Sequence, residues 1–108
     1  LGGTWKLTHV SGSVAGIDQD FTPGTVTWTF NVENNTVSVV NNTPDDSLTD
    51  FFPTWNYTYG YVQNEITPQS CTYTLAVSNI NFGCAASTST TLTLTQVESD
   101  GYVLTFIR

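Results

Sequence analysis

Few residues of this chain belong to the types that catalyse reactions or bind metals. Of 108 residues, His9 is the only histidine, and Cys71 and Cys84 are the only cysteines. A metal site needs several such ligands at matched spacing, and nucleophilic catalysis needs a base beside an activated nucleophile. Neither pattern surrounds His9, so we interpret it as a packed or rim histidine. We therefore expect no catalytic residue, no metal and no cofactor.

Acidic side chains outnumber basic ones by nine to two, which gives a formal net charge of −7. Such a field repels phosphate backbones and anionic lipid headgroups, so we expect no nucleic-acid partner. No apolar run approaches the roughly 20 residues that a membrane-spanning helix requires. The carboxylates fall in predicted loops and turns, where solvation leaves them ordinary: Asp18, Asp20, Asp45, Asp46, Asp50, Glu98 and Asp100. The aspartates at 45, 46 and 50 match no calcium-loop spacing, which favours a solvated acidic loop.

The two cysteines allow one intramolecular disulfide. Two buried free thiols, or half of a metal site, are the alternatives. No histidine or second cysteine pair stands at zinc spacing, so we favour a disulfide between Cys71 and Cys84. A disulfide in a chain poor in lysine and rich in threonine and asparagine indicates an oxidising compartment. We expect an exported protein, either periplasmic, a cell-surface lipoprotein or secreted.

Among the residue types that could form a binding site, only the aromatic ones are abundant, at 13% of residues. Strand alternation is expected to point seven of them inward: Trp28, Trp55, Tyr57, Tyr59, Phe82, Tyr102 and Phe106. Together they would form a chamber with hydrophobic walls and several phenolic donors. The candidate ligand-binding residues are Phe21, Trp28, Trp55, Tyr57, Tyr59 and Tyr102. The alternative is that these rings simply fill the interior.

Alternation of apolar and polar residues runs through almost the whole chain, and no apolar stripe has helical spacing. It predicts a single all-β domain over 1–108, with almost no helix. Eight strands are expected: Thr4–Val10, Thr25–Val32, Asn35–Asn41, Pro53–Val62, Cys71–Ala76, Asn79–Cys84, Ser89–Gln96 and Tyr102–Arg108. Irregular segments are expected at Ser11–Gly24, Asn42–Phe52 and Gln63–Ser70. An open sheet of this kind would leave two uncharged edges exposed, so we predict an antiparallel up-and-down barrel that closes between first and last strands.

The turns and the apolar pattern also predict how neighbouring strands pair. Phe30 should lie opposite Val37, and Trp28 opposite Val39. In the last hairpin, Leu94 should face Leu104 and Leu92 should face Phe106. If Cys71 lies opposite Cys84, Tyr73 faces Phe82 and Leu75 faces Ile80. In the first strand, Trp5, Leu7 and His9 are expected on one face.

The start and end of the chain resemble a known family. Gly3-Thr4-Trp5 resembles the Gly-x-Trp signature of lipocalins, and Arg108 resembles the arginine that packs over that tryptophan at the closed end of their barrel. The whole chain is similar to the lipocalin-like domains of lipoproteins from Bacteroidetes-type bacteria. The resemblance implies a calycin-type barrel with Trp5 and Arg108 as its plug. The chain lacks the C-terminal helix and extra length of larger lipocalins, which leaves less room for a cavity.

Two functions of different classes follow from these expectations. The first is a non-catalytic binding protein that carries a small hydrophobic ligand in the barrel mouth. The second is an interaction or inhibitor-type barrel that binds a macromolecular partner, such as a protein, through its open-end loops. Those loops carry the apolar residues Val14, Ile17, Phe21, Phe51 and Phe52, which are interpreted as lid residues, partner contacts or loop anchors.

Overall fold

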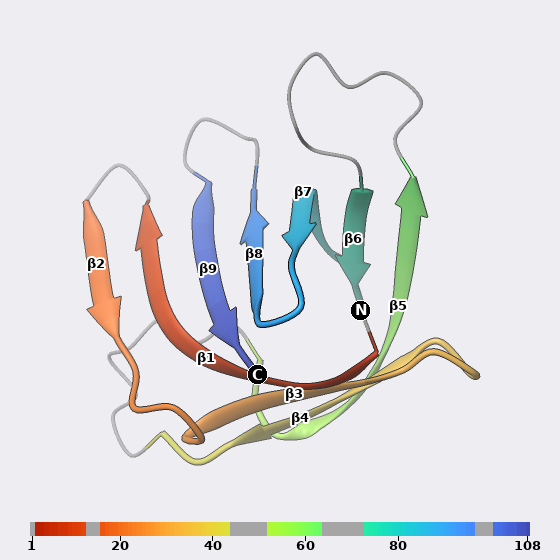
Figure 1. Ribbon diagram of the computed structural model, residues 1–108, viewed down its shortest axis with the longest axis horizontal. Helices are drawn as coiled ribbons and strands as arrows, with labels where there is room; N and C mark the ends of the chain where they lie inside the picture. The colour runs from red at the N-terminus through yellow and green to blue at the C-terminus, as the bar shows by residue number, and fades with distance from the viewer. Residues whose placement is uncertain (1, 13–15, 44–51, 64–72, 97–100) are drawn as a thin grey trace.

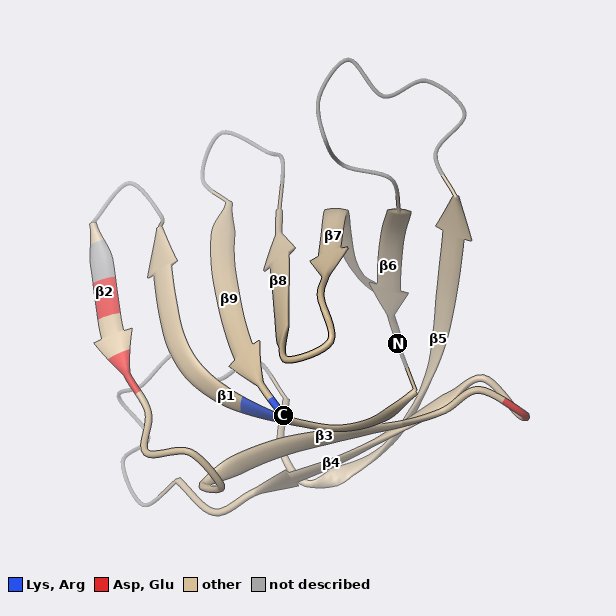
Figure 2. Ribbon diagram, viewed as in Figure 1, with Lys and Arg blue, Asp and Glu red and all other residues tan. Residues whose placement is uncertain are grey.

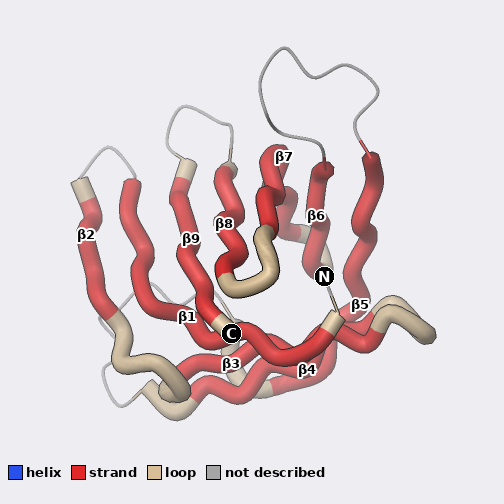
Figure 3. The backbone as a smooth tube through the Cα atoms, in the orientation of Figure 1, coloured by secondary structure: helices blue, strands red, loops and turns tan. Residues whose placement is uncertain are grey.

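The computed structural model describes residues 2–12, 16–43, 52–63, 73–96 and 101–108. These residues form strands and connecting turns, and none of them is helical (Figures 1 and 3). The strands are β1 (Gly3–Gly12), β2 (Ile17–Asp20), β3 (Val26–Asn31), β4 (Thr36–Asn41), β5 (Trp55–Gln63), β6 (Tyr73–Val77), β7 (Ile80–Ser87), β8 (Thr91–Thr95) and β9 (Tyr102–Ile107).

The sheet closes on itself as an antiparallel barrel of eight strands. Its order is β1-β3-β4-β5-β6-β7-β8-β9, and β9 returns to pair with β1. In that closing pair Leu7 lies opposite Phe106 and Val10 lies opposite Leu104. The predicted all-β antiparallel barrel and the predicted contact between the first and last strands are therefore confirmed. Closure leaves the eight strands without the long exposed edges of an open sheet.

β2 is a ninth strand that the sequence pattern did not predict. Residues 11–24 were expected to be irregular, but β2 pairs with the end of β1, with His9 opposite Asp20 and Gly12 opposite Ile17. The start of β1 pairs with β3 along the same edge, so β2 and β3 share one neighbour (Figure 1). The prediction missed β2 because its sequence, Ile-Asp-Gln-Asp, is short and lacks apolar alternation.

Alternation within each strand buries one row of side chains inside the barrel. Trp28 is at the centre of this core, with ring centroids 4.8 Å from Phe106, 5.4 Å from Phe52, 6.2 Å from Phe30 and 6.4 Å from Phe82. The predicted registers of β3 with β4 and of β8 with β9 are confirmed. The core is continuous between the two hairpins, because β3 and β9 both pack their rings against the same indole.

A bulge in β1 changes the face on which His9 lies. Leu7 pairs with Phe106, yet His9 pairs with Thr105, so one extra residue is accommodated between them. Beyond the bulge Val10 is the buried residue, whereas His9 is partly exposed. The prediction that His9 shares a face with Trp5 and Leu7 is therefore wrong, because strict alternation holds only where no residue is inserted.

The predicted register of β6 and β7 is also wrong. Leu75 lies opposite Phe82 rather than Ile80, and Tyr73 lies opposite Ala85 rather than Phe82. The turn is tighter than expected, with Ser78 in the left-handed region at φ 55° and Val77 paired with Ile80. A second irregularity lies between Tyr73 and Leu75. Cys71 lies outside the described residues, so the Cys71–Cys84 disulfide stays a prediction.

Candidate functional site

The predicted ligand-binding residues divide into three groups in the structure. Phe21, Trp28 and Tyr59 are buried, and burial raises the pKa of the Tyr59 hydroxyl above 10.0. Tyr57 and Tyr102 are half-buried and pack against the core. Trp55 is 71% exposed, so the prediction that its ring faces the interior is wrong. Trp55 is the first residue of β5 and forms the last pair of the β4–β5 ladder, opposite Val39, and it follows a bend at Thr54, so no further strand pair covers its ring.

Among the described residues, two buried side-chain polar atoms have no hydrogen-bond partner, Trp28 Nε1 and Thr43 Oγ1. Trp28 is fully buried, and its indole Nε1 donates no hydrogen bond. A buried donor left without an acceptor costs about 1 to 3 kcal/mol, so most buried indole nitrogens find one. The rings around Trp28 are those of Phe30, Phe52, Phe82 and Phe106, and none of them can accept that proton as an oxygen would.

Two of the apolar loop residues are anchors in the barrel. Phe21 is 6% exposed and Phe52 is 4% exposed, and Phe52 meets the Trp28 ring edge-on. Asn41 Nδ2 donates a hydrogen bond of 2.9 Å to the Phe52 carbonyl, which fixes the chain where it enters β5. Val14 and Phe51 lie outside the described residues, as does the side chain of Ile17.

Trp5 and Arg108 meet at one end of the barrel. Trp5 is fully buried, and the Arg108 Cζ lies 4.0 Å from the centroid of its ring. Arg108 Nη1 also donates a hydrogen bond of 3.0 Å to the Gly2 carbonyl. The guanidinium therefore contacts both the Trp5 ring in β1 and the backbone just before that strand. This is the arrangement expected for a plug that closes the barrel at this end.

An open groove of about 290 Å³ lies over β4 and the start of β5. We call it the Trp55 groove, and its lining residues are Ser38, Val39, Val40, Thr54, Trp55 and Asn56. β4 runs along the lower side of the molecule in Figure 1, and β5 begins there before it climbs the right side. Neither strand carries an aspartate, glutamate, lysine or arginine (Figure 2). The groove is therefore a neutral surface on a protein whose net charge is −7.

Hydrogen bonds hold the segment that carries the exposed indole. Thr54 Oγ1 accepts a hydrogen bond of 2.8 Å from the Asn41 backbone nitrogen and donates one of 3.3 Å to the Asn41 carbonyl. The Tyr57 hydroxyl donates to the Pro53 carbonyl at 2.9 Å. These bonds tie the residues before and after Trp55 to β4 and to one another. The indole is consequently presented to solvent from an ordered backbone.

The groove continues into a line of hydroxyl and amide side chains across four strands. Thr4 pairs with Thr29, Thr29 with Ser38, and Ser38 with Asn56. We call these four residues the hydroxyl row. Three of them are exposed and Ser38 is half-buried. Thr4 and Thr29 share a hydrogen bond of 2.9 Å between their hydroxyls, and the described residues offer the Ser38 and Asn56 side chains no hydrogen-bond partner.

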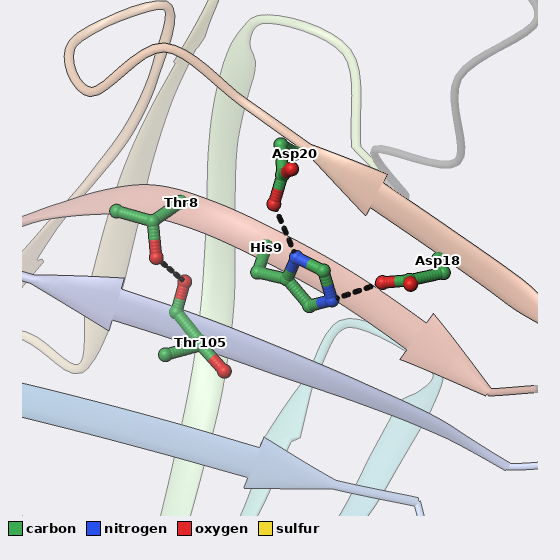
Figure 4. A network of polar contacts seen from close by, with 5 residues as sticks. All are labelled: Thr8, His9, Asp18, Asp20 and Thr105. Atoms are coloured by element: carbon green, nitrogen blue, oxygen red, sulfur yellow. Dashed lines mark hydrogen bonds and ion pairs between the residues drawn. The ribbon is translucent and has the colours of Figure 1, made fainter.

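His9 lies between two carboxylates of β2 (Figure 4). Its Nδ1 is 2.6 Å from Asp20 Oδ1, and its Nε2 is 2.6 Å from Asp18 Oδ1. The hydrogen bond to Asp20 is the main cause that raises the pKa of His9 above 6.5, the charges of Asp18 and Asp20 add to it, and partial burial opposes them. Asp18 and Asp20 were expected in a loop, whereas they lie on a strand and hold the one histidine. In the sequence, only the spacing of Asp18 and Asp20, two residues apart, could have indicated that both carboxylates contact His9.

The described residues hold no group of three or more histidine, cysteine or acidic side chains arranged to bind a metal ion. The two aspartates contact opposite nitrogens of the His9 ring, so one cation cannot replace both contacts. The predicted acidic residues Asp45, Asp46, Asp50, Glu98 and Asp100 lie outside the described part. Within the described part, no helix has the length and apolar character to cross a bilayer.

Comparison with known proteins leaves the family of this chain open. No family model, no curated protein sequence and no solved structure matches it.

Proposed function

We propose that this protein is a non-catalytic binding barrel that takes its ligand on the outer wall, in the Trp55 groove. The observation that carries the proposal is the 71% exposure of Trp55 beside a groove of about 290 Å³. Tryptophan is usually largely buried, because its ring loses the most by contact with water. A rigidly held, exposed indole is typical of surfaces that bind a partner.

The filled interior supports a site on the outer wall. The core rings of Trp28, Phe82 and Phe106 are fully buried and in mutual contact through Trp28. Phe52 and Phe21 fill space at the end opposite the plug, as loop anchors. A ligand inside the barrel would have to displace these rings, whereas a ligand in the Trp55 groove displaces only water.

The position of His9 supports a function without catalysis. A histidine that acts as a base needs one ring nitrogen free to take a proton from a substrate or nucleophile. Both nitrogens of His9 are occupied at 2.6 Å by carboxylates of β2. The ring therefore serves to join two strands.

We further propose that the chain is a lipocalin-like domain and that it is exported. The Gly3-Thr4-Trp5 motif, the contact of Trp5 with Arg108 and the eight-strand barrel support the first part. The two cysteines and the scarcity of lysine support the second. The plug stabilises the barrel and takes no part in ligand binding.

The three tryptophans allow the binding site to be located directly. Each indole N–H of Trp5, Trp28 and Trp55 gives its own signal in an ¹⁵N correlation spectrum of the labelled protein. We would titrate the protein with separate panels of neutral oligosaccharides, acidic oligosaccharides, fatty acids and unstructured peptides. The proposal predicts that a ligand shifts the Trp55 signal and leaves Trp5 in place. If every panel leaves Trp55 unmoved, the outer wall is not the binding surface.

The orphaned nitrogen of Trp28 favours a second candidate function. A small hydrophobic molecule with one acceptor oxygen would bind in the barrel, where that oxygen accepts the Nε1 proton and Phe52 moves aside. Native mass spectrometry of protein from its own source would detect such a molecule as an added mass. A matching shift of the Trp28 signal in the native protein, together with loss of the added mass in Trp28→Phe, would support an interior site. Protein that carries no added mass and whose Trp28 signal stays fixed with fatty acids would exclude it.

A further inference from the structure

We infer that the ligand of the Trp55 groove is a neutral oligosaccharide, bound by stacking of one sugar ring on Trp55 and by hydrogen bonds along the hydroxyl row. This inference rests on the proposed function and names the chemistry of its ligand. Four properties of the described residues lead to it: the exposed indole, the lack of charge, the unpaired hydroxyl and amide groups, and the direction of the row.

The indole selects a ligand with a flat apolar face. The face of an aromatic ring is electron-rich, so it attracts the slightly positive hydrogens of C–H bonds that lie flat against it. A hexopyranose ring presents such a C–H face and carries its hydroxyls around the rim. Trp55 exposes 71% of its surface and is therefore accessible to such a ring. Val40, at 42% exposure, extends the apolar floor of the groove.

The lining of the groove provides partners for the rim hydroxyls. The Asn56 amide offers two donors and an acceptor, and the Ser38 hydroxyl can donate or accept. The structure offers neither side chain a partner among the described residues, so neither must break an existing bond to bind sugar. Thr54 is different, because Asn41 already occupies its hydroxyl. Its part is to hold Trp55 in place.

The lack of charged side chains on β4 and β5 argues against a charged ligand in the groove. β4 and β5 carry no acidic or basic side chain, so a charged peptide or nucleotide finds no counter-ion there. Anionic ligands are also repelled by the net charge of −7. A molecule that combines an apolar face with neutral donors and acceptors fits best. Among biological polymers this describes a neutral glycan.

The hydroxyl row indicates that the ligand is a chain of sugars rather than one sugar. From Asn56 it passes through Ser38 and Thr29 to Thr4, one strand at a time. Neighbouring strands are about 4.8 Å apart, an interval close to the rise of one unit in an extended glycan. The groove itself is at the small end of the roughly 300 to 1,000 Å³ range of ligand sites, so it holds only the first units. The following units would lie over β4 and β3.

The experiment measures affinity for cellohexaose, mannohexaose and chitohexaose by calorimetry and by the Trp55 indole signal. We expect at least one to bind, and Trp55→Ala to weaken that binding at least about tenfold, or 1.4 kcal/mol. Trp55→Phe should retain part of the affinity, because a smaller ring still stacks. Ser38→Ala with Asn56→Ala should weaken it similarly. Val62→Ala, which trims another exposed side chain of β5, is the matched control and should change nothing.

The length of the ligand tests the row separately from the groove. Thr29→Ala should weaken binding of the hexasaccharide and leave the matching disaccharide unaffected, because only the longer chain reaches β3. An acidic hexasaccharide, oligogalacturonate, should not bind. Thermal melting of every variant verifies that the barrel still folds, as expected for changes at exposed positions.

The outcomes separate this inference from the proposed function. If no neutral oligosaccharide moves the Trp55 signal but a peptide or fatty acid does, the inference of a glycan ligand is wrong, while the proposed binding surface is supported. If no compound moves it, both are wrong. A Trp55 signal that shifts with protein concentration, together with sedimentation as a dimer, would make a second copy of the chain the occupant and overturn the inference. Binding that survives Trp55→Ala would also overturn it.

Discussion

His9 satisfies its two carboxylate partners only when its ring is protonated. Nδ1 and Nε2 each lie 2.6 Å from a carboxylate oxygen, and a nitrogen can donate only if it carries a hydrogen. A neutral imidazole has one such hydrogen, so it would leave one aspartate facing a lone pair. The carboxylates are exposed, at 76% for Asp18 and 91% for Asp20, so water and salt weaken the pairing without removing it.

We predict that β2 loosens from β1 as the pH rises. The pKa of His9 in the fold is raised above 6.5, so its contribution to stability is full below 6.5 and is lost as the pH passes the higher folded value. Hydrogen exchange at β2 amides, corrected for the intrinsic effect of pH, should speed up over that interval. His9→Gln should remove the pH dependence. Protection that stays constant in the native protein would show that the contacts with Asp18 and Asp20 do not hold the strand.

Arg108 and Trp5 should affect stability and leave binding intact. Arg108→Lys removes the planar group from the Trp5 ring, so we expect a loss of about 1 kcal/mol. Trp5→Ala removes a fully buried ring and should cost about 3 to 5 kcal/mol. Urea unfolding measures both losses, and neither variant changes the net charge. An Arg108→Lys protein as stable as the native one would mean that the stacked guanidinium adds nothing.

The contact between Trp5 and Arg108 could be predicted from the sequence, whereas the exposure of Trp55 could not. Trp5 lies in β1 and Arg108 directly follows β9, and these two strands pair, so the family resemblance and strand alternation both placed the two side chains together. Trp55 lies at a strand boundary beside a proline and a bend, where its direction depends on the local bonds of Thr54 and Tyr57. Such bonds leave no periodic signal. The pairing of His9 with Asp20 could not be predicted either. It depends on β2 and on the bulge in β1, and neither has a periodic signal in the sequence.

At the scale of the element, two glycines allow the start of β9 to pack against its neighbours. A Cβ added to Gly101 would lie 1.9 Å from the Gln96 carbonyl oxygen, and one added to Gly12 would lie 2.4 Å from the Gly101 carbonyl oxygen. Gly12 also has φ 120°, which side chains other than glycine rarely adopt. The nearest blocking atoms are backbone at both positions, so a side chain at Gly12 must shift the β1–β9 contact and one at Gly101 must shift the β8–β9 connection.

We predict that Gly101→Ala destabilises the barrel by about 1 to 3 kcal/mol or more. Gly60→Ala is the control, because a methyl there meets nothing within 4 Å and the residue has no positive φ. It should be neutral or slightly stabilising, since alanine restricts the unfolded chain. Equal melting temperatures for Gly101→Ala and Gly60→Ala would contradict the close approach of the strands.

The cysteines provide a prediction for the β6–β7 hairpin. We expect a thiol titration of the denatured, unreduced protein to find no free thiol, because Cys71 and Cys84 are bonded to each other. Replacing both by serine should then cost about 3 kcal/mol, the chain-entropy estimate for a loop of this length. Two reactive thiols in freshly isolated protein would contradict both the bond and the oxidising compartment inferred from it.

The strands themselves were largely predictable, and the irregularities between them were not. β3 with β4 and β8 with β9 have tight turns and strong alternation, so hydrophobic pairing left one register. For β6 with β7 the assumed opposition of the cysteines favoured a register two residues away from the observed Leu75–Phe82 pair. The bulges in β1 and β7 change which face the following side chains occupy, and neither bulge has a recognisable sequence signal. Each depends on contacts with a strand distant in the chain.

At the scale of the whole molecule, the fullness of the barrel and the place of its binding surface are linked. Eight strands enclose an interior little wider than their side chains, and here three fully buried aromatic rings meet there. Rings that stabilise the fold in this way leave little space for a ligand. The outer wall of β3, β4 and β5 therefore remains available for a ligand. Its rows of polar side chains continue from strand to strand because these strands pair in a regular register.

Closure also predicts that the chain tolerates new ends. Arg108 Nη1 reaches the Gly2 carbonyl at 3.0 Å, so a short glycine linker can join the present ends. New ends opened at the exposed Glu33–Asn34 turn, at the tip of the β3–β4 hairpin (Figure 2), break no ladder pair. We expect this permutant to fold to the same barrel, with a Trp55 indole signal at its native position, and to melt only slightly lower, because all strand pairs are kept.

Two further permutants make that result interpretable. Ends opened at the exposed Ser89–Thr90 turn should also be tolerated, since they too lie between paired strands. Ends opened between Trp28 and Thr29 should prevent folding, because they divide β3 where it pairs with both β1 and β4. If both turn permutants fail while the linear protein folds, the linker is straining a gap between first and last strands, and the ring formed by β1 and β9 is not closed in solution.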